Sequence, residues 1–154
     1  MNVRQTNSME QFTDLHPAAS TGDLASVRAL VLCGIDLDAF DDIGFTALHH
    51  AAHKEQLQVI LELLSSGANV DAQDENRIGN TPLGEVAGYC SLDVAKALVE
   101  HGADPRIAGW MGLSAIDRSR ERQREDGVYD MLLAAIEKAE QGMAGQPALS
   151  TSKS

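Results

Sequence analysis

Three closely spaced histidines are the first residues in the sequence that could do chemistry. His49, His50 and His53 fall within one and a half turns of a helix, and a pair spaced i, i+4 can bind a metal ion from one helix face. The run from 49 to 53 holds no cysteine or carboxylate that would complete a closed set of ligands. We therefore expect no metal site here.

Acidic residues form a second pattern that resembles a calcium loop in composition but not in order. The spacing lacks the arrangement of an EF-hand and its bidentate glutamate, so we predict loop acids whose summed field matters more than any pair. Residues 10 to 117 hold 17 acidic and 5 basic side chains, and the whole chain has 23 against 12, a net charge of −11. This charge favours a basic or neutral partner and disfavours nucleic acid. The acids concerned are Asp36, Asp38, Asp41, Asp42, Asp71, Asp74 and Glu75.

The two cysteines, Cys33 and Cys90, could supply a thiol nucleophile. We expect Cys90 to be exposed in a turn between helices and Cys33 to pack on an apolar helix, with both thiols free. No basic residue adjoins Cys90, and the sequence contains no Gly-x-Ser-x-Gly elbow, phosphate-binding glycine loop or repeated Cys-x-x-Cys. We expect no catalytic residue and no cofactor, and an enzyme using Cys90 or the histidines stays as the rival hypothesis.

A third of the basic residues are four arginines near the C-terminal end: Arg118, Arg120, Arg122 and Arg124. Alternate spacing spreads them around a helix, and acidic residues are interleaved with them. We interpret them as the solvated face of a capping helix. A phosphate or RNA contact is the alternative, which the acidity of the remaining chain opposes.

The length of the chain and its hydropathy indicate a single domain that does not span a membrane. A chain of 154 residues fits one domain. Its longest strictly apolar run, Met131 to Ile136, is six residues, far short of the ~20 needed to span a membrane, and Met1 to Glu10 does not resemble a signal peptide. We expect a cytoplasmic protein without membrane contact; the oligomeric state is left open.

The elements that position these residues repeat along the chain with a spacing of 33 to 35 residues. Thr46-Ala47-Leu48-His49 and Thr81-Pro82-Leu83-Gly84 occupy equivalent places, and each precedes an apolar stripe that ends in Gly-Ala. Weaker copies lie before and after them. The expected repeats are 11–40, 41–74, 75–108 and 109–139.

Three of the four copies open with the signals for a turn followed by a helix, and the first copy lacks this opening. A glycine suited to positive φ precedes, by two residues, a hydroxyl residue that can cap a helix, in the pairs Gly44 and Thr46, Gly79 and Thr81, Gly112 and Ser114. The second helix of the 41–74 copy ends at Gly67, which suits a left-handed C-terminal cap. Neither helix can bury its apolar stripe alone, so we predict that the copies stack into a solenoid.

The pattern resembles the ankyrin repeat over roughly residues 11 to 137. The resemblance implies an all-α, short stand-alone solenoid of helix-turn-helix repeats joined by hairpin fingers, with degenerate first and last repeats as caps. It also implies that His49 is a structural hydrogen-bonding residue. The segments 1–10 and 141–154 are small, polar and unpatterned, and we expect them to be disordered.

The resemblance implies a partner-binding surface made of the finger tips and the exposed face of each first helix. Four of the six aromatic residues fall on it, as in protein interfaces. The alternative is that Phe45 and Trp110 only pack one finger on the next. The predicted binding residues are Phe12, Asp42, Ile43, Phe45, His53, Lys54, Arg77, Ile78, Asn80, Tyr89, Trp110, Met111, Leu113 and Arg122, with Ser20, Thr21, Gly88 and Glu121 on the same face.

The sequence therefore predicts a non-enzymatic protein-binding module. Its acidity suggests an inhibitor or immunity protein that neutralises a basic partner such as a toxin enzyme. An adaptor that bridges two proteins is the alternative within the same class.

Overall fold

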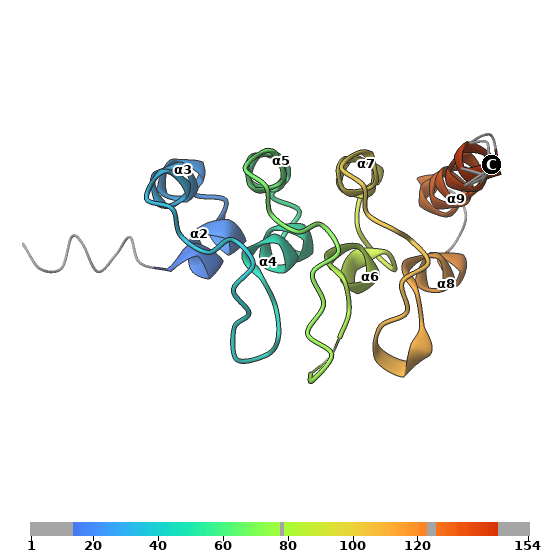
Figure 1. Ribbon diagram of the computed structural model, residues 1–154, viewed down its shortest axis with the longest axis horizontal. Coiled ribbons are helices and arrows are strands. Elements are labelled where there is room, and N and C mark those ends of the chain that lie inside the picture. The colour runs from blue at the N-terminus through green and yellow to red at the C-terminus, as the bar shows by residue number, and fades with distance from the viewer. Residues whose placement is uncertain (1–13, 78, 123–125, 145–154) are drawn as a thin grey trace, which may run out of the picture.

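The computed structural model describes residues 14–77, 79–122 and 126–144, and within these ranges all regular structure is helical. Figure 1 shows the helices in two rows, with one pair per repeat. We call the row beside the loops the inner row and the other the outer row. The inner row is α2 (Leu15–Thr21), α4 (Ala47–His53), α6 (Pro82–Val86) and α8 (Ala115–Arg120); the outer row is α3 (Leu24–Leu32), α5 (Leu57–Ser65), α7 (Leu92–Glu100) and α9 (Val128–Ala144). The predicted all-α repeat solenoid is confirmed.

The inner helices begin where the sequence predicted. Gly44, Gly79 and Gly112 have φ values of 85°, 65° and 71°. Two residues after each lies an N-cap: Thr46, Thr81 and Ser114. Ser114 forms a capping box with Asp117, and Pro82 occupies the first turn of α6, where its missing N–H costs nothing. Helix α5 ends before Gly67, which has a φ of 97°. Local turn chemistry thus fixes the register of each repeat.

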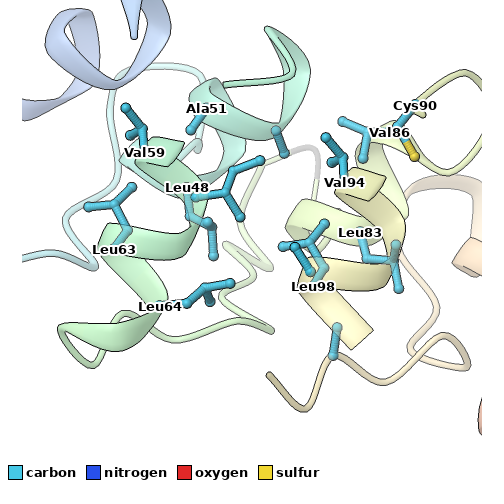
Figure 2. Close-up of a cluster of buried hydrophobic side chains, with 14 of the residues drawn as sticks. Leu48, Ala51, Val59, Leu63, Leu64, Leu83, Val86, Cys90, Val94 and Leu98 are labelled. Atoms are coloured by element: carbon cyan, nitrogen blue, oxygen red, sulfur yellow. The ribbon is translucent and has the colours of Figure 1, made fainter. Parts of the chain in front are cut away.

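The core is a continuous apolar layer between the two rows. Leu48 and Leu83 of the inner row and Ile60, Leu63 and Leu98 of the outer row are completely buried, as Figure 2 shows for most of them. Neighbouring inner helices approach closely because the residues between them are small, namely Ala51, Ala52 and Ala87. Each helix packs on the corresponding helix of the adjacent repeat, so the core extends from α2 to α9.

Three long loops join the repeats: residues 33–46, 66–81 and 101–114, here called the first, second and third fingers. All three project from the inner side of the molecule (Figure 1). Aspartates join adjacent fingers, since Asp38 accepts the backbone N–H of Asn69 at 2.7 Å and Asp71 accepts that of Asp104 at 3.1 Å. Several predicted loop acids therefore hold the fingers in place.

The C-terminal boundary differs from the prediction. Helix α9 continues to Ala144, four residues into the segment expected to be disordered, because Gln141, Met143 and Ala144 extend a helix at little cost. The remaining predicted tail lies outside the described residues, as do residues 1–13, Ile78 and Arg124. Of the helices described, none is both long and apolar enough to cross a membrane.

Candidate functional site

The histidine run supplies structural hydrogen bonds in the described part of the chain. His49 is fully buried; its Nδ1 accepts the N–H of Thr46 at 3.1 Å and its Nε2–H donates to the carbonyl of Asn80 at 2.8 Å. The pair of bonds requires neutral imidazole, and burial lowers the pKa of His49 from 6.5 to about 4. The predicted structural role is confirmed, and this side chain joins the second repeat to the third.

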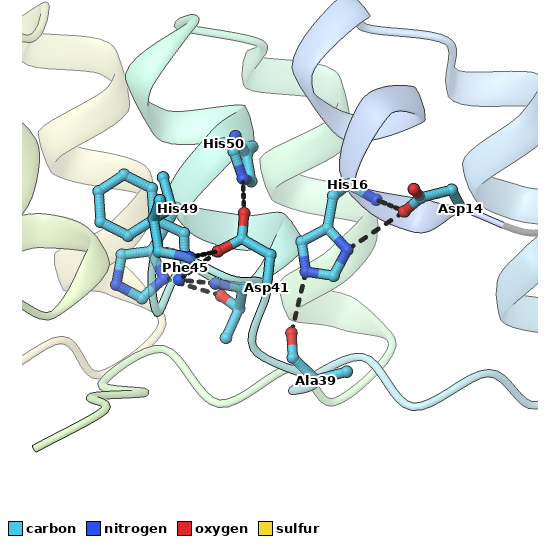
Figure 3. A network of polar contacts seen from close by, with 9 residues as sticks. Asp14, His16, Ala39, Asp41, Phe45, His49 and His50 are labelled. Atoms are coloured by element: carbon cyan, nitrogen blue, oxygen red, sulfur yellow. Dashed lines mark hydrogen bonds and ion pairs between the residues drawn. The ribbon is translucent and has the colours of Figure 1, made fainter. Parts of the chain in front are cut away.

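The two neighbouring histidines, His50 and His53, contact other side chains. His50 Nε2 lies 2.7 Å from Asp41, whose carboxylate also accepts two backbone N–H groups (Figure 3). Burial tends to raise the pKa of Asp41, but these hydrogen bonds outweigh it and hold the pKa below its ordinary value. His53 Nδ1 contacts the hydroxyl of Tyr89 at 2.5 Å. Among the described residues, no group of three or more potential ligands is arranged to hold a metal ion.

Both cysteines are free, as predicted, but the exposure predicted for each of them is wrong. Cys90 is completely buried, and burial raises the pKa of its thiol to about 11 although nearby Arg122 lowers it. The turn folds inward because the Cys90 N–H donates to Val86 at 2.8 Å and its carbonyl accepts from Arg122 at 2.7 Å. Cys33 is exposed because it caps the C-terminal end of α3 instead of facing the core. A position in a turn does not reveal which way the side chain faces.

Two residues predicted to bind a partner are instead buried. Phe45 is only 8% exposed and stacks on His49 with ring centroids 5.0 Å apart, so it belongs to the packing between fingers and helices. Asn80 is 5% exposed; its Oδ1 accepts the N–H of Trp110 at 2.8 Å and its Nδ2 donates to Glu85 at 2.7 Å. Their roles are structural because each residue stands at the base of a finger rather than at its tip.

The remaining described candidates lie at the surface. Arg122 is half-buried, and the exposed residues are Asp42, Ile43, His53, Lys54, Arg77, Tyr89, Trp110, Met111 and Leu113. Phe12 and Ile78 lie outside the described residues.

Exposed apolar side chains gather at the tip of the third finger. Trp110 is 57% exposed, Met111 72% and Leu113 36%; we call these three residues the third-finger tip. Its backbone is fixed, since Asn80 accepts the Trp110 N–H and the Trp110 carbonyl accepts from Arg118 at 3.2 Å. Met111 has a φ of 63°, a left-handed conformation that a non-glycine residue adopts at a cost of about 1 kcal/mol. The tip is therefore a rigid apolar projection.

Arg118 and Arg122 are less solvated than predicted. Arg118 donates to Asn80 and Trp110, and Arg122 donates to the carbonyls at the end of α6 and pairs with Asp126 at 2.7 Å. Arg118 ties the last repeat to the third through Asn80, and Arg122 does so through the carbonyls of Ala87 and Cys90 in the turn after α6. Arg120 is exposed and lies over the ring of Tyr129, 5.9 Å from its centroid.

Comparison with known families agrees with this architecture. A family model described as ankyrin repeats (3 copies) matches residues 15–109. The chain belongs to the ankyrin-repeat family.

Relatives of this ankyrin-repeat chain differ widely in kind. It is 31% identical to the B-cell lymphoma 3 protein homolog of Mus musculus over 93% of the chain and 31% of the mouse protein. It is 29% identical to the putative ankyrin repeat protein YahD of Escherichia coli over 73% of the chain and 58% of that protein. A match to serine/threonine-protein kinase 12 of Arabidopsis thaliana covers 19% of the kinase. The chain spans less than two thirds of these relatives. What they share with it is the repeat, which generally serves as a protein-interaction module and not as an enzyme.

The sequence did not predict the residues that surround Tyr89 and hold the third-finger tip. Burial and then Glu85 and Glu55 raise the pKa of Tyr89, and Arg118 holds the third-finger tip. The repeat spacing offered a signal, because residues about one period apart become neighbours: Glu55 accepts the N–H of Ser91, 36 positions later.

Proposed function

We propose that this ankyrin-repeat chain is a cytoplasmic inhibitor that binds a basic protein through its inner surface, as an immunity protein covers a toxin enzyme. By the inner surface we mean the finger tips and the exposed side of the inner row. The observation that carries the proposal is the third-finger tip, an exposed apolar projection on a strongly acidic chain.

The conformation of Met111 supports a binding role for the tip. Glycine would adopt a φ of 63° without strain, and a side chain that is 72% exposed adds little to the core. The fold therefore gains nothing from methionine at this position. An apolar side chain presented from a fixed backbone is suited to filling a pocket on another protein, because the loop itself loses little conformational entropy on binding.

Charge supports a basic partner. The exposed acids Asp42, Glu55 and Glu75 stand on or beside the inner surface, and the chain carries a net charge of −11. Such a field accelerates association with a basic protein and repels acidic ones. Apolar contact would then supply the slow dissociation that an inhibitor needs.

The test compares affinity capture from native lysate by three forms of the chain. The double variant Trp110→Ser, Met111→Gly removes the projection while allowing the left-handed turn. Leu32→Ser is the matched control, since Leu32 is 88% exposed but lies on the outer helix α3. We expect a basic protein to be retained by the wild type and the control and to bind the double variant at least 30-fold more weakly, as for a hot spot of about 2 kcal/mol.

The captured protein is then purified and its activity is measured with and without the chain. Loss of its activity on binding supports inhibition, whereas simultaneous retention of two proteins with activity intact would replace the inhibitor by an adaptor. Equal capture by all three forms, or an acidic partner, would refute the assignment of the surface.

A further inference from the structure

A hollow of about 500 Å³ opens on the inner surface between the end of α6 and helix α8. Its lining carries two carboxylates, Glu85 and Glu121, and two guanidiniums, Arg118 and Arg122, so these charges cancel. We infer that the hollow receives a primary carboxamide, the side-chain group of asparagine and glutamine, from the partner protein. The inference rests on the proposed function in taking the inner surface as the binding face.

One wall of the hollow is apolar and fixed. Tyr89 is 48% exposed; its hydroxyl lies 2.5 Å from Nδ1 of His53, and the two rings meet edge to face with centroids 5.7 Å apart. Leu113 lies on the same lining, and Gly88 leaves space because it has no side chain. This wall suits the methylene stem of an uncharged side chain, while a few polar groups fix the orientation of its end.

The polar side of the lining offers both acceptors and donors. Glu85 is oriented by the Nδ2 of Asn80 at 2.7 Å, and the exposed carboxylate of Glu121 has no hydrogen bond within the described part of the chain. A primary amide has two N–H donors for two carboxylates and a carbonyl oxygen for a guanidinium. A backbone peptide group has only one N–H, so it satisfies this lining less completely than a side-chain amide does.

One donor on this lining lacks an acceptor. The Nε–H of Arg118 is buried and has no partner among the described residues, whereas Nη2 of the same side chain donates to Asn80 and to the Trp110 carbonyl, each at 3.2 Å. Both bonds lie at the long end of the normal range, so an oxygen atom entering the hollow can draw the guanidinium toward itself. A buried donor without an acceptor is unfavourable, and the carbonyl oxygen of an amide would supply the missing acceptor.

The balance of charge disfavours a charged occupant of either sign. Arg122 donates to backbone carbonyls in the turn after α6 and pairs with Asp126 at 2.7 Å, so it is already satisfied. A cationic side chain would be repelled by the guanidinium of Arg118 and would bring no acceptor for it. An anionic side chain would be repelled by Glu85 and Glu121. A neutral amide avoids both repulsions and can bond to groups of both signs.

The test follows backbone amide and arginine Nε–H resonances of the full chain by NMR while side-chain-sized probes are added. The probes are the Nα-acetyl N-methylamides of glutamine, norleucine, arginine and glutamate, which share the same backbone groups. With the glutamine compound we expect saturable shifts at the amides of Gly88, Tyr89 and Glu121 and at the Nε–H of Arg118. The other three compounds should bind about tenfold more weakly, as the loss of one or two hydrogen bonds implies. Added salt should hardly change binding of the glutamine compound, because it is neutral.

Two variants test the location and the balance of charge. Gly88→Leu fills the hollow at little cost to the fold, because a Cβ there would have only the Arg118 carbonyl within 4.0 Å and the φ of Gly88 is not in the left-handed region. Glu121→Gln leaves the hollow with a net positive charge, so it should bind the glutamate compound more tightly than the wild type does. The matched control Glu137→Gln makes the same charge change at an exposed position on the outer helix α9.

We expect Gly88→Leu to lose binding of the glutamine compound and Glu137→Gln to behave as the wild type does. Absence of saturable shifts, equal binding of the norleucine compound or of a charged compound, or unaltered binding by Gly88→Leu would overturn the inference. So would a Glu121→Gln protein that binds the glutamate compound no more tightly than the control does. Those results would leave capture through the third-finger tip intact, whereas a failed capture experiment alongside positive titration would refute only the inhibitor proposal.

Discussion

Mild acid, between pH 7 and pH 5, should destabilise this protein chiefly through His49, whose pKa falls from 6.5 to about 4. The imidazole is buried in its neutral form with both ring nitrogens hydrogen-bonded, and a second proton would convert the Nδ1 acceptor that faces the Thr46 N–H into a donor. The folded protein must therefore resist a protonation that the unfolded chain accepts freely. The test variant is His49→Gln, which keeps a donor and an acceptor but does not titrate.

The size of the effect follows from the pKa difference. The pKa falls from 6.5 to about 4 on folding, so between these values the unfolded state binds more protons and the free energy of unfolding rises with pH. Stability is fully present above pH 6.5 and is lost as the pH falls towards 4. The loss amounts to about 2 kcal/mol between pH 7 and pH 5 and about 3 kcal/mol in all.

The assay is urea unfolding followed by helical circular dichroism at several pH values from 7 to 5, with m-values compared between proteins. Near pH 5.3 we expect the free energy of unfolding of the wild type to change with pH by about 1.2 kcal/mol per pH unit more than that of His49→Gln. Groups common to both proteins cancel in this difference. Equal pH slopes for the two proteins would refute the reasoning, whatever their relative stability at pH 7.

Other predictions address single positions. A disulfide reagent should modify Cys33 quickly and Cys90 only on unfolding, because Cys33 is exposed and burial raises the pKa of Cys90 to about 11; a Cys33→Ser protein that still reacts quickly would contradict this. Met111→Gly should raise the free energy of unfolding by about 0.5–1 kcal/mol by removing left-handed strain, and a lower urea midpoint would count against that strain. Gly109→Ala should lower the free energy of unfolding by about 1–3 kcal/mol, because the added methyl group clashes with Asn80 and with the carbonyl of Gly79. Fluorescence of Trp110, the only tryptophan, should then report a loosened third finger.

Local signals explain why so much of the fold could be predicted. Gly44, Thr46 and Pro82 each act on their own turn, and the apolar stripes repeat with a fixed period, so helix starts and stacking follow from neighbouring residues. Two errors fell on side chains whose environment is set by another repeat: Asn80 accepts the N–H of Trp110, 30 positions later, and Cys90 is enclosed when Arg122, 32 positions later, binds its carbonyl. Phe45 is covered within its own repeat, where it stacks on His49.

The packing of each repeat on its neighbours explains how the inner surface can hold the left-handed backbone conformation of Met111 without disrupting the whole fold. Contacts between repeats join residues about one period apart, such as Arg28 with Glu62 and His49 with Asn80, and each helix packs only on its neighbours. A costly conformation at Met111 therefore weakens the third finger and the repeats beside it, while the core around α4 and α5 is unaffected. For this reason a side chain at a finger tip can be selected for binding, and Met111 is the position where replacement by glycine should weaken binding and raise stability.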